Sequence, residues 1–437
     1  MASIVPDLPP GRELEVEQGY PIEAIPAPAN AYPATLALHA DESFDHMLSD
    51  VAPPIHVSTT FRYSKDDTKL IAAKDRESFA PTEFIYSRVT APSTTRLEAV
   101  LTSLMRSPTP AITYSSGLSA IHAILTFLTP KVVSVGDGYH GSHGVLGLYQ
   151  RLTKCKIVSL DCSADELGVG DLIMLETPVN PSGEAFNIHA FAEKAHSRGA
   201  YLMVDSTFAP PPIQEPFSLG ADIVMHSGTK YFGGHSDLLC GVVAVKRKEW
   251  VSRMVMDRVF LGSVMGGLEG WLGVRSIRTL ELRVERQSRN AHELISWLHN
   301  ALTTNEEAAP TTENSDSSTP VIRRAVSSIL PHSSLQSHAS HPDSSWLTTQ
   351  MPHGLYSPVF SIHTHTESQA RRLPSVLKYF HHATSLGGVE SLIEWRCMSD
   401  SGCDKRLLRI SVGIEDVRDL KEDLKKGFEI IGVGSSE

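Results

Sequence analysis

One lysine of the chain is placed for covalent chemistry with a cofactor. Lys230 lies in the stretch Ser227-Gly228-Thr229-Lys230-Tyr231, just after an apolar run, Ala221 to Met225, that predicts a buried strand. Burial favours the neutral, nucleophilic amine, which can form an imine with a carbonyl cofactor. Ser227 and Thr229 offer hydroxyl donors to a phosphate on that cofactor. A lysine at a strand end is also often an ordinary surface residue, and other segments must decide.

Two upstream segments supply groups that such a cofactor needs. Asp205 ends the apolar run Tyr201 to Val204. A carboxylate there either caps a turn or pairs with the ring nitrogen of pyridoxal phosphate, which makes the ring an electron sink for carbanions. The small-residue turn Ser115 to Ala120 opens a helical stretch, Ile121 to Leu128. Its free amides and the helix dipole suit a phosphate, although many helices begin with Ser and Gly.

With Lys230, Asp205 and the turn at Gly117 in this order, the chain resembles the trans-sulfuration family of pyridoxal phosphate enzymes. That family includes cystathionine γ-synthase, cystathionine γ- and β-lyases, O-acetylhomoserine sulfhydrylase and methionine γ-lyase. The resemblance extends from about Val51 to Phe428. It is carried by further motifs: Pro53-Pro54-Ile55, Ser58 to Phe61, Tyr86-Ser87-Arg88, Glu176-Thr177-Pro178, Asn180-Pro181, Val204-Asp205, Thr207-Phe208, His226 to Asp237, Ser385 to Leu392 and Arg409 to Glu415.

The resemblance implies how the cofactor is held. Lys230 would carry pyridoxal 5'-phosphate and later act as a proton shuttle, while Asp205 would hold the ring nitrogen. The phosphate would lie in a cradle of backbone amides and hydroxyls from four residues: Gly117, Leu118, Ser227 and Thr229.

The resemblance also assigns the residues around the substrate. Tyr139 matches the tyrosine that stacks on the cofactor ring near the chemistry, although it is otherwise an amphipathic residue at a strand end. Asn180 matches the residue that hydrogen-bonds the cofactor's 3-oxygen beside the substrate, and its plain alternative is a turn former. Arg409 would bind the substrate α-carboxylate in bidentate fashion, or else form an internal salt bridge. Ser385 matches a position beside that carboxylate, and Thr384 precedes it.

Tyr86 and Arg88 match a pair that, in the family, comes from a neighbouring subunit and clamps the phosphate. In that role they would make a monomer incomplete, and the resemblance implies an obligate dimer and a tetramer built as a dimer of dimers. Two solvated residues on a surface loop are the alternative.

Composition fits an enzyme of this kind. The 437 residues are 41% hydrophobic and 20% charged, as in a soluble globular protein. The net charge of −11 argues against a nucleic-acid surface, and no apolar run is long enough to span a bilayer. The amino terminus lacks the regions of a signal peptide. Five scattered cysteines indicate reduced thiols and a cytoplasmic protein.

The chain divides into three zones. Residues 1–62 predict an extended arm because of Pro26, Pro28 and Pro33, and in the resembling family this arm reaches a neighbouring subunit. Residues 63–285 predict a cofactor-binding α/β domain with helices on both faces of a largely parallel sheet. The resemblance implies fold type I of the pyridoxal phosphate enzymes, with a seven-stranded sheet. The expected strands are Val132 to Val135, Ile157 to Leu160, Leu172 to Leu175, Leu202 to Val204, Ile223 to Met225 and Val242 to Val245.

Residues 286–437 predict a smaller α+β domain. Segment 269–300 is long and charged, and it is predicted to be helical and to bridge the two domains. Segment 303–345, rich in Ser, Thr, Asn and Pro, predicts an insertion of low order. Val359 to His365 alternates like a half-buried strand, Arg406 to Val412 predicts a second strand, and Asp416 to Gly427 a closing helix.

The segment before Leu386-Gly387-Gly388 favours γ- over β-chemistry, because β-lyases of the family tend to carry a bulky aromatic there and this chain has Thr384-Ser385. Where many members have a glycine and an asparagine after the Tyr-x-Arg pair, this chain has Thr90 and Ala91. Gly144 replaces the arginine usual in cystathionine-handling members. Thr384 replaces a common acidic residue, and Gly141 stands where methionine γ-lyases have cysteine. This loss of charge and bulk favours a less polar or larger second substrate.

The hypothesis is γ-replacement on an O-acetyl- or O-succinyl-L-homoserine through a vinylglycine-type imine. The nucleophile is sulfide, a thiol, cysteine, or a carbon or amine nucleophile of specialised metabolism. Two alternatives are a cystathionine γ-synthase or γ-lyase of sulfur metabolism, and a catalytically silent binding protein. A P-loop is excluded because Thr229 and Val224 stand where it needs glycine. No metal is expected, since histidines such as His363 and His365 fit a solvated strand face better than a metal site.

Overall fold

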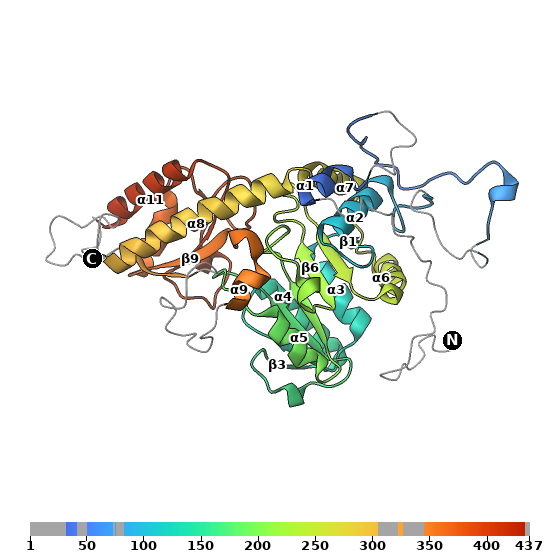
Figure 1. Ribbon diagram of the computed structural model, residues 1–437, viewed down its shortest axis with the longest axis horizontal. Helices are drawn as coiled ribbons and strands as arrows, with labels where there is room; N and C mark the ends of the chain where they lie inside the picture. Colours follow the sequence, from blue (N-terminus) through green and yellow to red (C-terminus); the bar gives the residue numbers. More distant parts are fainter. Residues whose placement is uncertain are drawn as a thin grey trace.

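The computed structural model describes residues 32–41, 50–72, 75, 83–304, 322–326 and 345–432. Figure 1 shows a large sheet domain and a smaller domain, joined along a long helix, α8. The described helices are α1 Pro33–His39, α2 Pro92–Leu104, α3 Gly117–Leu128, α4 His140–Thr153, α5 Ile188–His196, α6 Lys248–Leu261, α7 Gly267–Ile277, α8 Leu280–Thr304, α9 Ser345–Gln350, α10 Glu367–Val376 and α11 Val417–Gly432. Short 3₁₀ helices lie at Asp67–Lys69, Ala164–Glu166, Pro216–Leu219, Pro352–Gly354 and Arg396–Met398.

The large domain is built on a seven-stranded sheet with the order β1-β7-β6-β5-β4-β2-β3. All neighbours pair in parallel except β7, which is antiparallel to both β1 and β6. The predicted mostly parallel sheet is therefore confirmed, with one strand, β1, that the apolar runs did not reveal. The strands are β1 Ile112–Tyr114, β2 Val132–Val135, β3 Lys156–Ser159, β4 Leu172–Glu176, β5 Tyr201–Asp205, β6 Ile223–Ser227 and β7 Gly241–Val245.

Helices cover both faces of this sheet. One core cluster joins α3, α4 and α6 to residues such as Met174 and Met203, while another joins α2, α5 and α7 to residues such as Ile173 and Val204. Since successive strand residues face opposite sides, a strand between two helical layers is apolar along its whole length. This explains why the central strands were visible in the sequence as unbroken apolar runs.

The predicted helical segment 269–300 is helical, and it consists of two helices, α7 and α8, with a break between them. The break at Thr279 involves no proline or glycine. The Thr279 hydroxyl donates to Ser276 O at 3.2 Å, and the Arg283 guanidinium donates to the same carbonyl at 2.9 Å. The predicted bridging role holds for α8, since Leu280 packs in the large core and Leu294 in the core of the smaller domain.

The smaller domain contains a five-stranded sheet with the order β10-β11-β12-β9-β8. Its strands are β8 Ile322–Val326, β9 Val359–Thr364, β10 His381–His382, β11 Leu392–Trp395 and β12 Leu407–Ser411. The expectation that β9 is half-buried is wrong. Ser361 is only 1% exposed, because this strand packs against the large domain and the Ser361 hydroxyl donates to Pro181 O at 2.8 Å.

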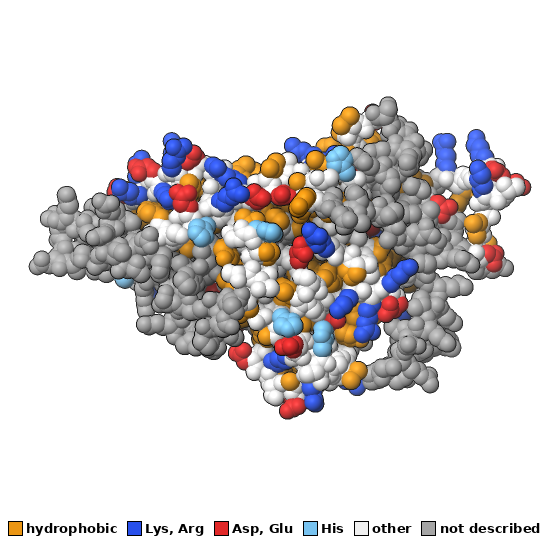
Figure 2. Space-filling model, viewed as in Figure 1, with side chains coloured by type: hydrophobic (Ala, Val, Ile, Leu, Met, Phe, Trp, Pro, Cys, Tyr) orange, Lys and Arg blue, Asp and Glu red, His pale blue; other side chains and the backbone are white. Residues whose placement is uncertain are grey.

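The outer face of the smaller domain is charged. Figure 2 shows Lys, Arg, Asp and Glu side chains interspersed over α11 and α8. Lys421 pairs with Glu293 between these helices at 2.6 Å, and Arg418 pairs with Asp416 at 2.7 Å. These charged side chains face solvent.

Two expectations about the flanking segments need correction. Pro33 does not keep the arm extended but begins α1, where its fixed φ and missing N–H suit the first helical turn. Asp41, just after that helix, pairs with Arg96 at 3.1 Å and holds the helix against α2.

Within the predicted low-order insertion, Ile322–Val326 forms strand β8 beside β9. The rest of that insertion from residue 305 to 344, with Pro26 and Pro28 of the arm, lies outside the described residues.

Among the described residues, no helix has the length and apolar character needed to cross a bilayer. The five cysteines are all free thiols.

A glycine on β7 makes it possible for the sheet and α3 to approach closely. A Cβ at Gly241 would collide with Ser116 O, whereas a Cβ at Gly147, inside α4, would meet nothing within 4 Å. We expect Gly241→Ala to lower the free energy of unfolding by about 1–3 kcal/mol through overpacking. Gly147→Ala should raise it by about 0.5–1 kcal/mol through helix propensity. Denaturant unfolding of the apoprotein measures both, and shifts of the same sign would contradict the packing described.

Candidate active site

The candidate active site lies at the carboxyl ends of the parallel strands, where ligands bind in open α/β sheets. Asp205 is the last residue of β5, and Glu176, the last residue of β4, stands directly opposite it in the register. Lys230 follows the end of β6, and Gly138 follows β2. The topology therefore brings together groups that are 25 or more residues apart in the chain.

Lys230 reaches across to the smaller domain. Its Nζ donates a hydrogen bond to Ser385 Oγ at 2.9 Å. Burial lowers the pKa of Lys230 to about 8, and the positive charge of Arg409 acts in the same direction, while Glu394 opposes it. An amine with this pKa is substantially neutral near pH 8, which a nucleophile and a proton acceptor both require.

Asp205 and Glu176 form a pair of neighbouring carboxyl groups. Asp205 Oδ1 accepts hydrogen bonds from Thr207 N and Oγ1, at 3.0 and 2.5 Å. Burial raises the pKa of Asp205, and burial together with the Asp205 charge raises the pKa of Glu176 to about 8. A cation between these groups would relieve the repulsion, and a protonated ring nitrogen is such a cation.

Glu176 is the site residue that the sequence reasoning left without a role. It stood in a matched motif, and its position at a strand end, like that of Asp205, was the signal. Its Oε2 accepts from Tyr139 N at 2.9 Å and its Oε1 from Asn180 N at 2.7 Å. The carboxyl group thus fixes the two loops that carry Tyr139 and Asn180.

The start of α3 forms a cradle of backbone amides that suits an anion. Ser116 and Ser119 make a reciprocal capping box, and helix geometry leaves the Gly117 and Leu118 amides free for a ligand. A Cβ at Gly117 would lie 3.0 Å from Ser227 Cβ, so α3 and the end of β6 are in contact. Thr229 is placed differently: its hydroxyl accepts from Cys240 N at 3.0 Å and donates to Cys240 O at 3.3 Å. Thr229 therefore supports the loop that carries Lys230.

Tyr139 caps α4 beside this cradle and is 38% exposed. A Cβ at Gly141 would collide with the Tyr139 ring and lie 3.0 Å from Leu118 Cδ2. The absence of a side chain at Gly141 is therefore what leaves room for the ring next to the cradle. The stacking role that the resemblance implies for Tyr139 stays a prediction.

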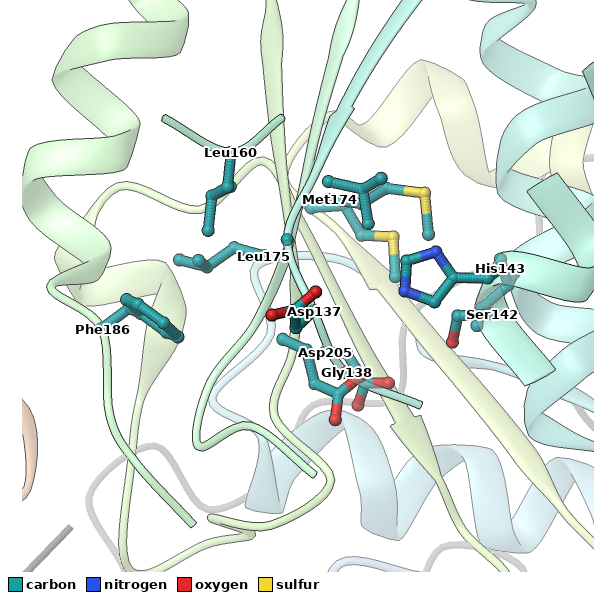
Figure 3. Close-up of a pocket in the computed structure, with 14 residues that line it drawn as sticks. Asp137, Gly138, Ser142, His143, Leu160, Met174, Leu175, Phe186 and Asp205 are labelled. Carbon is teal, nitrogen blue, oxygen red and sulfur yellow. The ribbon is translucent and has the colours of Figure 1, made fainter. Parts of the chain in front are cut away.

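Figure 3 shows the pocket beside the strand ends. Asp205 points toward the loop at Gly138, with Ser142 and His143 of α4 to one side of it and Phe186 on the other side of the strands. Glu176 also lines this pocket. The pocket is thus bordered by the acidic pair and by the first turn of the helix that Tyr139 caps.

Arg409 is only 4% exposed and is held from three directions. One Nη donates to Asn180 Oδ1 at 3.1 Å, and the other donates to Ser385 O at 2.7 Å and to Glu394 Oε2 at 2.8 Å. Burial lowers the pKa of Arg409 to about 10, so it stays charged at neutral pH. The internal salt bridge that the sequence left as an alternative exists, and its consequence for a substrate carboxylate is taken up below.

Ser385 has a strained backbone. Its φ of +78° lies in the left-handed region, which costs a non-glycine residue about 1–3 kcal/mol. Its hydroxyl contacts Lys230 and its carbonyl contacts Arg409. In this conformation, the hydroxyl and the carbonyl of Ser385 each bind a different residue of the candidate site.

Three of the predicted site residues, Tyr86, Arg88 and Thr384, are exposed. Arg88 stacks over the Tyr86 ring at 5.1 Å, and Tyr86 pairs with Thr60. Within the described part of the chain, neither residue has a contact with Lys230 or Asp205 among the hydrogen bonds and ion pairs found. Thr384 is exposed, as is Gly144, which faces open space.

The residues brought together fit pyridoxal phosphate. The start of α3 with Ser227 suits the phosphate, Lys230 suits the carbonyl carbon, and Asp205 suits the ring nitrogen. The same conclusion follows from comparison with known proteins. Residues 34–429 match the family model described as Cys/Met metabolism PLP-dependent enzyme. The chain belongs to this family. Its cofactor is therefore pyridoxal phosphate.

The relatives include enzymes of different reaction types. The chain is 31% identical to a cystathionine β-lyase of Lactococcus lactis, over 90% of this chain and 98% of the relative. It is 29% identical to the cystathionine γ-synthase of Escherichia coli, over 92% and 99%. A solved structure titled a methionine γ-lyase from Micromonospora echinospora superposes with a TM-score of 0.75 at 29% identity, covering 91% of this chain and 99% of that one. Overall identity therefore does not choose between replacement and elimination.

The lowered pKa of Lys230 leads to a pH-dependent prediction. Because the neutral amine attacks the cofactor, the rate at which apoprotein captures added pyridoxal phosphate should rise about tenfold per pH unit below pH 8 and level off above it. Borohydride trapping followed by peptide mass spectrometry measures the rate and the site. Lys230→Ala is the control and should give no label in this peptide. An inflection near the ordinary lysine value, or a label on another lysine, would contradict the assignment.

Proposed function

We propose that this protein is a pyridoxal phosphate-dependent transferase that catalyses γ-replacement on an O-acyl-L-homoserine, with O-acetyl-L-homoserine as the preferred donor. The observation that carries the proposal is the contact between Lys230 and Ser385 in a segment of small residues. A γ-replacement needs one base to reach both the Cα and the Cβ protons of the substrate. The segment Thr384 to Gly388, which Lys230 contacts through Ser385, carries no bulky aromatic, and this supports room for both steps.

The residues divide the work between charge and proton transfer. Bound pyridoxal phosphate supplies an electron sink for negative charge at the substrate carbons. Asp205 keeps the ring nitrogen protonated, and Arg409 holds the α-carboxylate. Lys230, with its pKa near 8, removes protons and returns them, while Ser385 holds its Nζ on the substrate side.

The entrance for the second substrate favours a nucleophile without a strong charge. Gly144 and Thr384 are both exposed, and Gly144 has open space where a side chain would begin. Neither residue offers a charge to an amino-acid nucleophile. This supports sulfide, a thiol, or a carbon or amine nucleophile, and with the last two a role in specialised metabolism.

One alternative has a specific observation in its favour. The relatives include a cystathionine γ-lyase of Bacillus subtilis at 31% identity. The same groups that remove the Cα and Cβ protons would support elimination when water competes better than the second substrate. A γ-lyase or γ-synthase acting on cystathionine is therefore the second candidate.

The deciding experiment is mass spectrometry of the products formed from O-acetyl-L-homoserine by the holoenzyme. Parallel reactions contain no nucleophile, sulfide, cysteine, or a set of aldehydes, β-keto esters and cyclic amines. We expect a carbon-, nitrogen- or thiol-linked amino acid as the efficient product. Cystathionine as the sole efficient product would make the protein a γ-synthase, and 2-oxobutanoate and ammonia under every condition would make it a lyase. Turnover of no donor at all would favour a silent binding protein.

Charge added at the entrance should change the nucleophile. We expect Gly144→Arg combined with Thr384→Glu to raise the preference for cysteine over an uncharged thiol by about tenfold, since the new groups pair with its carboxylate and ammonium. Competition between the two nucleophiles measures the ratio. Gly147→Arg is the matched control because it adds the same charge to the same helix at another open position. An unchanged ratio in the double variant would contradict the argument from the entrance.

We also propose a homo-oligomer in which Tyr86 and Arg88 complete a neighbour's phosphate site, with a tetramer as the expected assembly. Among the described residues, this pair forms no hydrogen bond or ion pair with Lys230 or Asp205, which supports the proposal. Further support comes from exposed apolar side chains on α6 and α7, such as Phe260 (79%) and Leu268 (48%). The free cysteines favour a cytoplasmic location.

Subunit sharing can be tested by complementation. Lys230→Ala and Arg88→Ala should each inactivate the enzyme alone. A mixed dimer should regain roughly half of the wild-type activity, because one of its two sites then carries both intact residues. Co-expression with two different tags isolates the mixed species. A mixed dimer as inactive as its parents would show that Arg88 acts within its own subunit.

A further inference from the structure

A second buried arginine shares the carboxylate that holds Arg409. Glu394 lies on β11 directly opposite Arg409 on β12, and Arg396 follows two residues later. Glu394 Oε2 accepts from Arg409 and from Arg396, at 2.8 Å in each case. The three side chains are 2–4% exposed. Two guanidinium groups are thus buried against one carboxylate.

The three buried side chains, Arg409, Arg396 and Glu394, carry one excess positive charge. The positive charge of Arg409 and hydrogen bonds from Ser399 and Arg396 lower the pKa of Glu394 despite its burial, so the carboxylate is ionised at neutral pH. The next acidic group, Asp400, lies 3.8 Å from Arg396 and is partly solvated. Arg396 Nε is buried and has no hydrogen-bond partner in the described structure. A buried excess charge is costly unless an anion balances it.

The arrangement also fixes the direction of Arg409. Asn180, Ser385 and Glu394 hold its guanidinium, and Ser399 Oγ donates to Glu394 Oε1 at 2.7 Å. Arg396 donates to the same Ser399 hydroxyl at 3.0 Å. If Glu394 faced Arg409 alone, the pair would be neutral and would attract a carboxylate only weakly. Arg396 restores one net positive charge to the group.

We propose that Arg396 is a positioning residue for the substrate carboxylate. Because Arg396 also pairs with Glu394, its positive charge offsets the negative charge of that carboxylate. Glu394 can then orient Arg409 while the group as a whole keeps one positive charge for the substrate. The inference deepens the proposed function, because it rests on Arg409 as the carboxylate site. It concerns only the binding of an α-amino acid and makes no use of a γ-substituent.

The test uses the holoenzyme and two unreactive ligands, L-alanine and L-alaninamide, titrated by the change in cofactor absorbance. They differ only in the carboxylate. We expect Arg396→Gln to weaken L-alanine binding about 10- to 100-fold and L-alaninamide binding by less than about threefold. Removing the carboxylate as well, in Glu394→Gln with Arg396→Gln, should bring L-alanine binding back to within about threefold of wild type, since Arg409 then carries the net charge alone.

Arg396→Lys is the conservative control, because it keeps the charge without the planar fork. It should bind L-alanine within about fivefold of wild type. Thermal unfolding and cofactor absorbance show whether each variant is folded and loaded. If the double variant does not fold, the comparison of Arg396→Lys with Arg396→Gln decides the matter. Equal loss for both single variants, equal loss of both ligands, or a folded double variant without recovery would overturn the inference.

The result can be separated from the proposed reaction. Recovery in the double variant supports the role of Arg396 even if O-acetyl-L-homoserine yields no replacement product, because L-alanine has no γ-substituent. Conversely, the wild-type enzyme could catalyse efficient γ-replacement while the Arg396→Gln variant binds L-alanine normally. That result would support the proposed reaction and contradict the role of Arg396.

Discussion

The hydrogen bond from Lys230 Nζ to Ser385 Oγ joins the two domains at the candidate active site. The large domain alone would leave this amine at the open end of a sheet, where water would keep it protonated. Contact with the smaller domain removes water from it and places the Arg409 charge close by, and both lower its pKa. The relative position of the domains, which α8 sets by packing in both cores, therefore controls the basicity of the amine.

The two domains present side chains of opposite charge at this junction. The acidic groups Asp205 and Glu176 stand at the strand ends of the large domain, whereas Arg409 and Arg396 stand in the smaller domain around Glu394. A zwitterionic amino acid bound between them would have its carboxylate directed to the smaller domain. Its amino group would then lie toward Lys230. The electrostatics thus orient a substrate before any specific contact with its side chain.

The sequence predicted the large domain better than the smaller one for a physical reason. Parallel strands covered on both faces are apolar throughout, so the runs ending near Asp205 and before Lys230 could be found without knowing their neighbours. β1 is only three residues long and gave no such signal. Ser361 looked solvent-facing because its partner, Pro181 O, belongs to the other domain. The break at Thr279 contains no proline or glycine that would have marked it, and the buried Arg283 donates there to Thr279 Oγ1 and Ser276 O.

The candidate site was likewise predicted only in part. The family resemblance singled out Lys230, Asp205, Asn180 and Arg409 as site residues, because each stands in a matched local motif. It gave no role to Glu176 and no sign of Arg396, because their effects depend on charges brought near by tertiary packing. Protonation in particular follows from the surroundings of a group and cannot be assigned from its neighbours in the chain.

Glycines at the site separate what the cofactor requires from what the substrates allow. At Gly117 and Gly141 a Cβ would press on Ser227 or on the Tyr139 ring, so these positions are constrained by the cradle and the stacking residue. At Gly144 a Cβ would meet nothing within 4 Å, so packing does not require a glycine there. Steric constraint therefore explains the first two and does not explain the third. Under the proposed function, the missing charge at Gly144 would act on the second substrate, so the specificity of this enzyme is to be sought there rather than in the cofactor-binding residues.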